Sequence, residues 1–138
     1  MNVELLKDAY QILAGIPAKR FVRDLRMLVT DNSCGTLACG IGWLALYPHA
    51  PFDALEYRHW GLAFHRDTMD FDMAAKLFFE LPSTKSSVRL FGIRQHSKYD
   101  KEMGAGDLSD KALLLYRIRR ELGEQRSIAL AAAKKDSA

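Results

Sequence analysis

The sequence contains only two cysteines, Cys34 and Cys39, and lacks an apolar run of membrane-spanning length. A transmembrane helix needs about 20 consecutive apolar residues, so we expect no segment within a membrane. The N-terminus also lacks the features of a secretory signal, and two cysteines without such a signal fit a reducing compartment. We therefore expect a cytoplasmic protein.

A strong charge of either sign is also missing, because the 138 residues carry a formal net charge of only +3. Such a mild excess permits contact with nucleic acid but does not argue for it. No internal repeat is visible, and the length fits one domain. We expect a single globular domain over residues 1–133 and a frayed C-terminal tail over residues 134–138.

Charged side chains are absent from the stretch between Gly35 and Tyr47, which ends at Pro48. A helix that is apolar on all sides is typically buried, and residues 31–33 can all cap a helix N-terminus. Small side chains at spacings of three and four would let another backbone approach closely. The sequence therefore predicts a buried central helix over 35–47, around which the other elements pack.

Further elements follow from the spacing of apolar residues. Residues 18–30 fit a helix or a strand equally well, and the alternation from Trp60 to Phe64 predicts a short strand. The polar segment 93–107 reads as an exposed loop, either functional or disordered. Helices are expected over 2–14, 71–80, 83–91 and 109–122, with an alanine-rich extension over 128–133. Together these elements predict a single compact, mostly helical α+β domain.

One short motif carries a family resemblance, because residues 34–43 read C-G-T-L-A-C-G-I-G-W. This segment resembles a C-G-T-x-x-C-x-x-G-[W/H] helix signature of small uncharacterised proteins from phages and bacterial mobile elements. Gly61-Leu62 and Leu77-Phe78 resemble later parts of the same proteins. The resemblance implies a compact soluble domain of phage type and implies nothing about a substrate.

Aromatic side chains are the candidate contacts for a protein partner. Tyrosine and tryptophan are favoured at interface hot spots, and we single out Tyr57, Trp60 and Tyr99. Small phage-type proteins without a visible active site often act by covering a host protein's surface. We therefore expect a non-catalytic protein-binding module that modulates or inhibits a host protein.

A papain-like thiol hydrolase is the first alternative. Such enzymes place the nucleophilic cysteine at a helix N-terminus and take the histidine base from the start of a strand. Cys34 and His59 fit these two positions, although the flanking motifs of known families are absent. The helix dipole supplies only about 0.3–1 kcal/mol, which is too little to activate a thiol alone, so we expect both cysteines to be unreactive in the native protein.

Nucleic-acid binding and metal binding are the remaining alternatives. The arginines of residues 19–26 and 117–126 could contact phosphates, but no recognised nucleic-acid-binding motif accompanies them. A zinc site would have to combine Cys34, Cys39, His49 and His59 at irregular spacing. We therefore expect no metal and no other cofactor.

Overall fold

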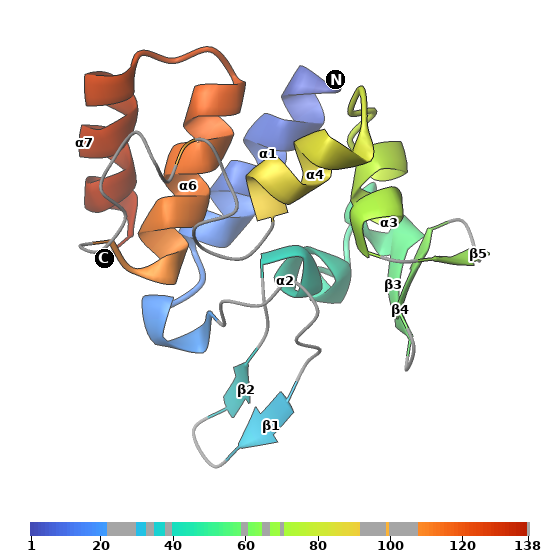
Figure 1. The fold of residues 1–138 in the computed structure, drawn as a ribbon. Coiled ribbons are helices and arrows are strands. Elements are labelled where there is room, and N and C mark those ends of the chain that lie inside the picture. The colour runs from blue at the N-terminus through green and yellow to red at the C-terminus, as the bar shows by residue number, and fades with distance from the viewer. Residues whose placement is uncertain are drawn as a thin grey trace.

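A computed structural model describes residues 1–21, 30–32, 35–37, 40–58, 61–64, 67–69, 71–91, 99 and 108–137. These residues form six α-helices, two short 3₁₀-helices (η1 and η2) and five short strands. The helices pack together, and two small sheets extend away from them (Figure 1). No helix in the described ranges is long and apolar enough to cross a bilayer.

Helix α6, Asp110–Glu121, is the central helix of the described structure. It is buried on every side from Lys111 to Ile118, and the Ser109 hydroxyl caps its start by accepting a hydrogen bond from the Ala112 amide at 3.1 Å. Figure 1 shows α6 between α7 on one side and α1 with α4 on the other. Its helical neighbours are α1 (Val3–Ala14), η1 (Ala18–Arg20), α4 (Thr84–Phe91) and α7 (Arg126–Asp136).

Two buried cations of α6 bind the C-terminal ends of neighbouring helices. The Lys111 ammonium donates to the Ala14 carbonyl of α1 at 2.7 Å, and an Arg117 guanidinium nitrogen donates to the Leu90 carbonyl of α4 at 3.2 Å. The last carbonyls of a helix lack helical partners and carry partial negative charge. These carbonyls therefore allow Lys111 and Arg117 to be only 1% and 3% exposed.

The predicted central helix over 35–47 is wrong in its first half. Gly35–Leu37 forms strand β2, which pairs antiparallel with β1, Thr30–Asn32. Glycine is a poor helix former, and pairing with β1 gives this backbone an alternative set of hydrogen bonds. Helix α2 begins only at Gly40 and ends at Leu46.

Gly40 lies in close contact with the central helix. A Cβ atom at this position would lie 2.3 Å from Cδ2 of Leu114 on α6. One turn further along α2, the Trp43 indole donates to the Arg20 carbonyl at the end of η1 at 3.0 Å. Gly40 therefore does serve close packing, but in a helix of seven residues rather than one of thirteen.

A three-stranded antiparallel sheet follows α2 and η2 (Phe52–Ala54), in the order β3-β4-β5. Its strands are β3 (Leu55–Arg58), β4 (Gly61–Phe64) and β5 (Asp67–Met69). The strand predicted over 60–64 is confirmed at Gly61–Phe64, whereas β3 and β5 fall in segments for which no strand was predicted. Helix α3 (Phe71–Phe78) packs on β4, and the rings of Phe64 and Phe78 meet edge to face with their centroids 5.7 Å apart.

The predicted helices over 2–14, 71–80, 83–91 and 109–122 are confirmed as α1, α3, α4 and α6. The expected frayed tail is wrong for residues 134–136, because α7 is a separate helix that continues to Asp136. Gly123, with φ of 90°, supplies the left-handed turn between α6 and α7. The described domain is mostly helical, and since each strand has only three or four residues it is closer to all-α than to α+β.

Candidate functional site

The residues predicted to carry function do not form one described site. Cys34, His59 and Trp60 lie outside the described residues. Tyr57 belongs to β3, where the backbone alone is described. Most of the 93–107 segment and residues 22–29 also lie outside the described ranges, so the choice between helix and strand there stays open.

Tyr99 is part of the core rather than an exposed contact. It is 4% exposed, and its hydroxyl donates to the Glu121 carboxylate at 2.6 Å. Arg89 donates to the same carboxylate at 2.6 and 3.0 Å. Burial and the hydrogen bond to Glu121 raise the pKa of Tyr99. We therefore do not retain Tyr99 as a binding residue.

The structural premise for a thiol hydrolase is wrong. Cys34 precedes a strand, Gly35–Leu37, and helix α2 begins only at Gly40. The argument that a helix dipole lowers the pKa of the Cys34 thiol therefore no longer applies. Among the described residues, no group of three or more His, Cys, Asp or Glu side chains could hold a metal ion.

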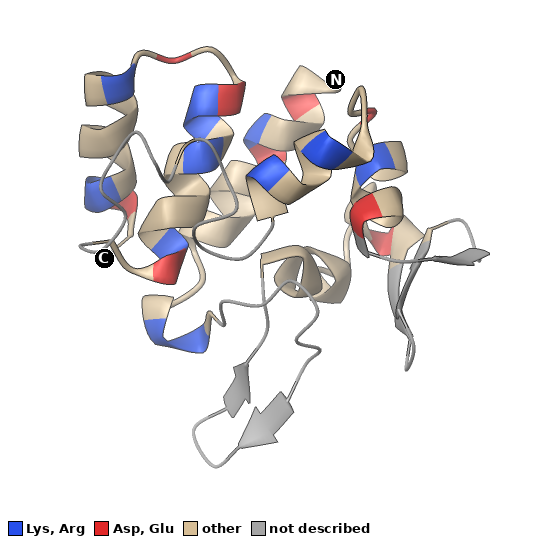
Figure 2. Ribbon diagram, in the orientation of Figure 1, with Lys and Arg blue, Asp and Glu red and all other residues tan. Residues whose placement is uncertain are grey.

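The predicted basic cluster over 117–126 is mostly occupied within the fold. Arg117 of α6 is buried against α4, where it donates to the Leu90 carbonyl, and Arg120 donates to the Glu124 carbonyl at 2.8 Å. Arg119 binds two carboxylates, whereas Arg126 is exposed. Figure 2 shows basic residues spread over several helices with acidic residues among them. The 117–126 cluster therefore does not favour nucleic-acid binding, which needs free cations on one face. Arg23 and Arg26 of the other predicted cluster, over 19–26, lie outside the described residues.

Arg119 is the centre of a polar cluster that contains three hydrogen-bond partners among the described residues, Tyr10, Glu124 and Asp136. Its Nε donates to the Tyr10 hydroxyl at 2.7 Å, one terminal nitrogen donates to both Glu124 oxygens at 3.1 and 2.7 Å, and the other lies 3.3 Å from Asp136. The Tyr10 hydroxyl donates in turn to Asp136. The cluster therefore connects α1, α6, the α6–α7 turn and the end of α7.

The pKa values of the cluster reflect these contacts. The hydrogen bond from Tyr10 and the charge of Arg119 lower the pKa of Asp136 below its ordinary value. Burial and the hydrogen bond to Asp136 raise the pKa of Tyr10 to about 12. Burial alone would lower the pKa of Arg119, but its hydrogen bonds to Tyr10 and Glu124 raise it. All three groups therefore hold their charge state firmly at neutral pH.

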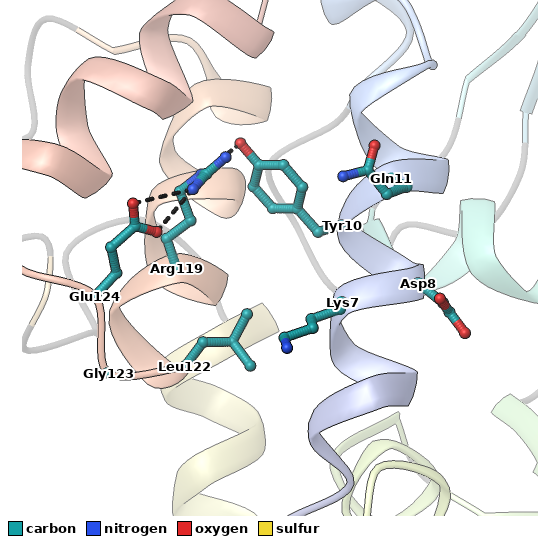
Figure 3. Close-up of a pocket in the computed structure, with 8 residues that line it drawn as sticks. All are labelled: Lys7, Asp8, Tyr10, Gln11, Arg119, Leu122, Gly123 and Glu124. Atoms are coloured by element: carbon teal, nitrogen blue, oxygen red, sulfur yellow. Dashed lines mark hydrogen bonds and ion pairs between the residues drawn. The ribbon is translucent and has the colours of Figure 1, made fainter.

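A pocket of about 480 Å³ opens beside this cluster, between α1 and the turn that joins α6 to α7. In Figure 3, Tyr10 and Leu122 face the space between the helices, and Lys7 extends across it toward Leu122. Asp8 points away from it. The residues that line this pocket, called here the α1–α6 pocket, are Lys7, Asp8, Tyr10, Gln11, Arg119, Leu122, Gly123 and Glu124.

Four large apolar side chains are exposed where α1 begins and along α3. Met1, Val3, Met73 and Leu77 are 44%, 41%, 36% and 44% exposed. The Asn2 amide donates to the Phe79 carbonyl at 2.8 Å, which joins the start of α1 to the end of α3. We call these four side chains the α1–α3 apolar set.

Comparison with known proteins found no matching family, no matching curated protein and no matching solved structure. The function therefore has to be inferred from the chemistry of the chain itself.

Sequence reasoning missed the Arg119 cluster and the α1–α6 pocket. Tyr10 and Arg119 are 109 positions apart, and Tyr10 and Asp136 are 126 positions apart. No local spacing rule connects residues at such separations. The one local signal was the acidic Glu124 directly after the Gly123 turn, close enough to Arg119 to pair with it.

Proposed function

We propose that this chain is a non-catalytic protein-binding module and that the α1–α3 apolar set is part of its contact surface. The exposure of Met73 and Leu77 on α3 is the observation that carries the proposal. They lie one helical turn apart, whereas Ala74, Ala75 and Phe78 of the same helix are buried. Residues i and i+4 are neighbours on a helix surface, so Met73 and Leu77 present adjoining apolar groups, and adjoining exposed apolar side chains commonly mark interaction sites.

The use of the polar side chains supports binding over catalysis. Lys111 and Arg117 bind helix ends, Glu121 binds Arg89 and Tyr99, and Arg119 binds Glu124 and Asp136. Each of these groups has a structural partner in the fold. The resemblance of residues 34–43 to phage proteins adds the class of partner, a host protein. Tyr57 and Trp60 stay candidate contacts, because β3 belongs to the sheet on which α3 packs.

Affinity capture from host cells tests this proposal. The tagged chain should retain one stoichiometric host protein, and Leu77→Asp should weaken retention by about tenfold or more, because the buried centre of an interface excludes charge. Ile128→Asp is the matched control, since Ile128 is an equally apolar, 54% exposed residue on α7. Both variants should keep the melting temperature of the parent.

Two outcomes would contradict the proposal. One is that no host protein is retained at all. The other is that Leu77→Asp and Ile128→Asp retain the partner equally well. Tyr57→Ala and Trp60→Ala, tested in the same way, would show whether the contact surface extends onto the sheet.

Thiol reactivity separates binding from the hydrolase alternative. We expect slow alkylation of Cys34 by iodoacetamide at neutral pH and full alkylation in denaturant, because a thiol without an activating partner has a pKa near 8.5. Fast labelling of the native chain that is abolished by His59→Ala would instead support a Cys34–His59 pair. Intact-mass spectrometry over time measures both rates.

A further inference from the structure

We infer that the α1–α6 pocket binds small organic carboxylates that carry a flat apolar body. This site is independent of the proposed protein-binding function, because it lies beside the middle of α1, at residues 7–11, and shares no residue with the α1–α3 apolar set. Its volume of about 480 Å³ falls in the range of typical small-molecule sites, about 300–1,000 Å³.

The apolar part of the pocket favours a flat hydrophobic body. The Leu122 side chain and the Tyr10 ring line the space from opposite helices (Figure 3). Tyr10 is only 4% exposed and Arg119 lies over its ring, so Leu122 supplies the open apolar surface. A flat ring can lie against Leu122 and reach the exposed part of Tyr10, since ring faces and aliphatic groups pack well together.

The polar groups of the pocket favour a negative charge on the ligand. Both Glu124 oxygens already accept hydrogen bonds from Arg119, and Asp8 points away from the space (Figure 3). The groups left to meet a ligand are the Lys7 ammonium and the Gln11 amide, and within the described ranges the Gln11 side chain makes no hydrogen bond. The ammonium carries a positive charge and the amide nitrogen can donate beside it, so together they match a carboxylate rather than a cation.

Lys7 can exchange its present partner for a ligand. It pairs with Glu4 at 3.5 Å, and both side chains are largely exposed. Exposed pairs of this kind contribute little to stability. A ligand carboxylate at the edge of the pocket can therefore displace Glu4 with small loss.

The side of the pocket formed by Arg119 and Glu124 is already ordered without a ligand. Arg119 uses all three guanidinium nitrogens, toward Tyr10, Glu124 and Asp136. The two carboxylates offset its charge, so Lys7 determines the electrostatic preference of the open side. A wall that is fixed in advance avoids the entropy cost of ordering it on binding.

Titration of the full chain with four probes tests the inference. The probes are benzoate, benzamide, benzylamine and acetate, followed by amide and methyl chemical shifts at low salt. Benzoate should bind at least about fivefold more tightly than the other three, because it alone carries both the ring and the anion. The largest shifts should come from Leu122, Gly123 and Tyr10.

Substitutions then test whether Lys7 is the residue that binds the carboxylate of benzoate. Lys7→Met should weaken benzoate binding by about fivefold or more, because it removes the ammonium but keeps the length of the side chain. Lys85→Met on α4 is the matched control, since Lys85 is exposed and lies outside the pocket, and it should leave the affinity unchanged. Gln11→Glu should weaken binding by repulsion.

Three results would overturn the inference. Benzylamine or benzamide could bind as tightly as benzoate, the shifted residues could lie away from the pocket, or Lys7→Met could behave like Lys85→Met. Because Gln11→Glu and Lys7→Met change exposed positions, the fold should survive in both. An unchanged melting temperature without benzoate would show that it has.

Discussion

Lys111 and Arg117 lie in the buried part of α6, residues 111–118, whose other side chains are mostly apolar, and each is balanced by the carbonyl end of another helix. An unpaired buried charge would be very costly. Burial accordingly lowers the pKa of Lys111. The hydrogen bonds to Ala14 and Leu90 offset this cost and also satisfy carbonyls that have no partner within their own helix.

Arg117→Met tests this role at a single residue. It replaces the guanidinium with an apolar chain of similar size and leaves the Leu90 carbonyl with one hydrogen bond fewer. An unsatisfied buried group costs about 1–3 kcal/mol, so we expect a loss of that size in urea unfolding. Arg126→Met, at an exposed position on α7, should change stability by less than about 0.5 kcal/mol. Equal effects of the two substitutions would contradict the assignment.

Gly40 and Leu114 form a second contact that can be tested between two residues. Gly40→Ala should destabilise the domain by about 1–3 kcal/mol, because the new methyl group overlaps Cδ2 of Leu114. In a Leu114→Ala background the overlap is gone, and the same Gly40→Ala change should cost close to nothing. A double-mutant cycle measured by urea unfolding gives the coupling directly. Additive effects of the two substitutions would show that α2 and α6 do not approach as described.

At the scale of elements, the Arg119 cluster holds α7 in place from both ends. Glu124 precedes the helix, and Asp136 is its last residue. Because the pKa of Asp136 is lowered in the fold, its charged form is the one that stabilises the native state. This stabilisation is present above the ordinary pKa of 3.8 and is lost as the pH falls through the lowered value.

Asp136→Asn should therefore have an effect that depends on pH. At pH 7 we expect a loss of about 1 kcal/mol, in line with a partly exposed ion pair and one hydrogen bond. Below the lowered pKa the variant and the parent should converge, because the parent carboxylate is then also neutral. Asp53→Asn, at an exposed position, is the control and should show no such convergence. A pH-independent difference for Asp136→Asn would contradict the cluster.

The elements that were predicted correctly carry their signals locally. Helix α6 has a serine cap and an acidic first turn, and α1 has an apolar stripe that stops at Gly15. Residues 35–37 have no comparable local signal. They form a strand because they pair with residues 30–32, and the spacing of apolar residues does not reveal this pairing. The tail was mispredicted because Asp136 is ordered by Tyr10, a residue of the first helix.

At the scale of the whole molecule, the uncharged stretch and the central position belong to different segments. The stretch 35–47 has no charge but supplies a short strand and a seven-residue helix, of which Ile41 and Leu44 reach the core. Helix α6 contains Lys111, Arg117, Arg119 and Arg120 and reads as a partly solvated helix, yet it is the one enclosed by other elements. A charged side chain can be buried when a helix end lies opposite, and that arrangement is visible only in three dimensions.

The candidate site was unpredictable for the same reason. The α1–α6 pocket joins residues 7–11 to residues 119–124, and its wall depends on Asp136 from the last helix. The residues that a single sequence singled out, Cys34 and Tyr99 among them, were chosen by chemical type. The residue type alone does not tell whether a tyrosine is an exposed contact or, like Tyr99, is buried in the core and hydrogen-bonded to Glu121.

Native-state hydrogen exchange tests the central claim most directly, namely that the domain is organised around α6. Amides in the most stable part of a protein exchange only through global unfolding, whereas peripheral elements open locally. We predict that amides 114–118 exchange with the free energy of global unfolding measured in urea, and about tenfold or more slowly than amides 44–46 of α2. Slower exchange in 44–46 than in 114–118 would contradict the account and restore the stretch 35–47 as the centre of the fold.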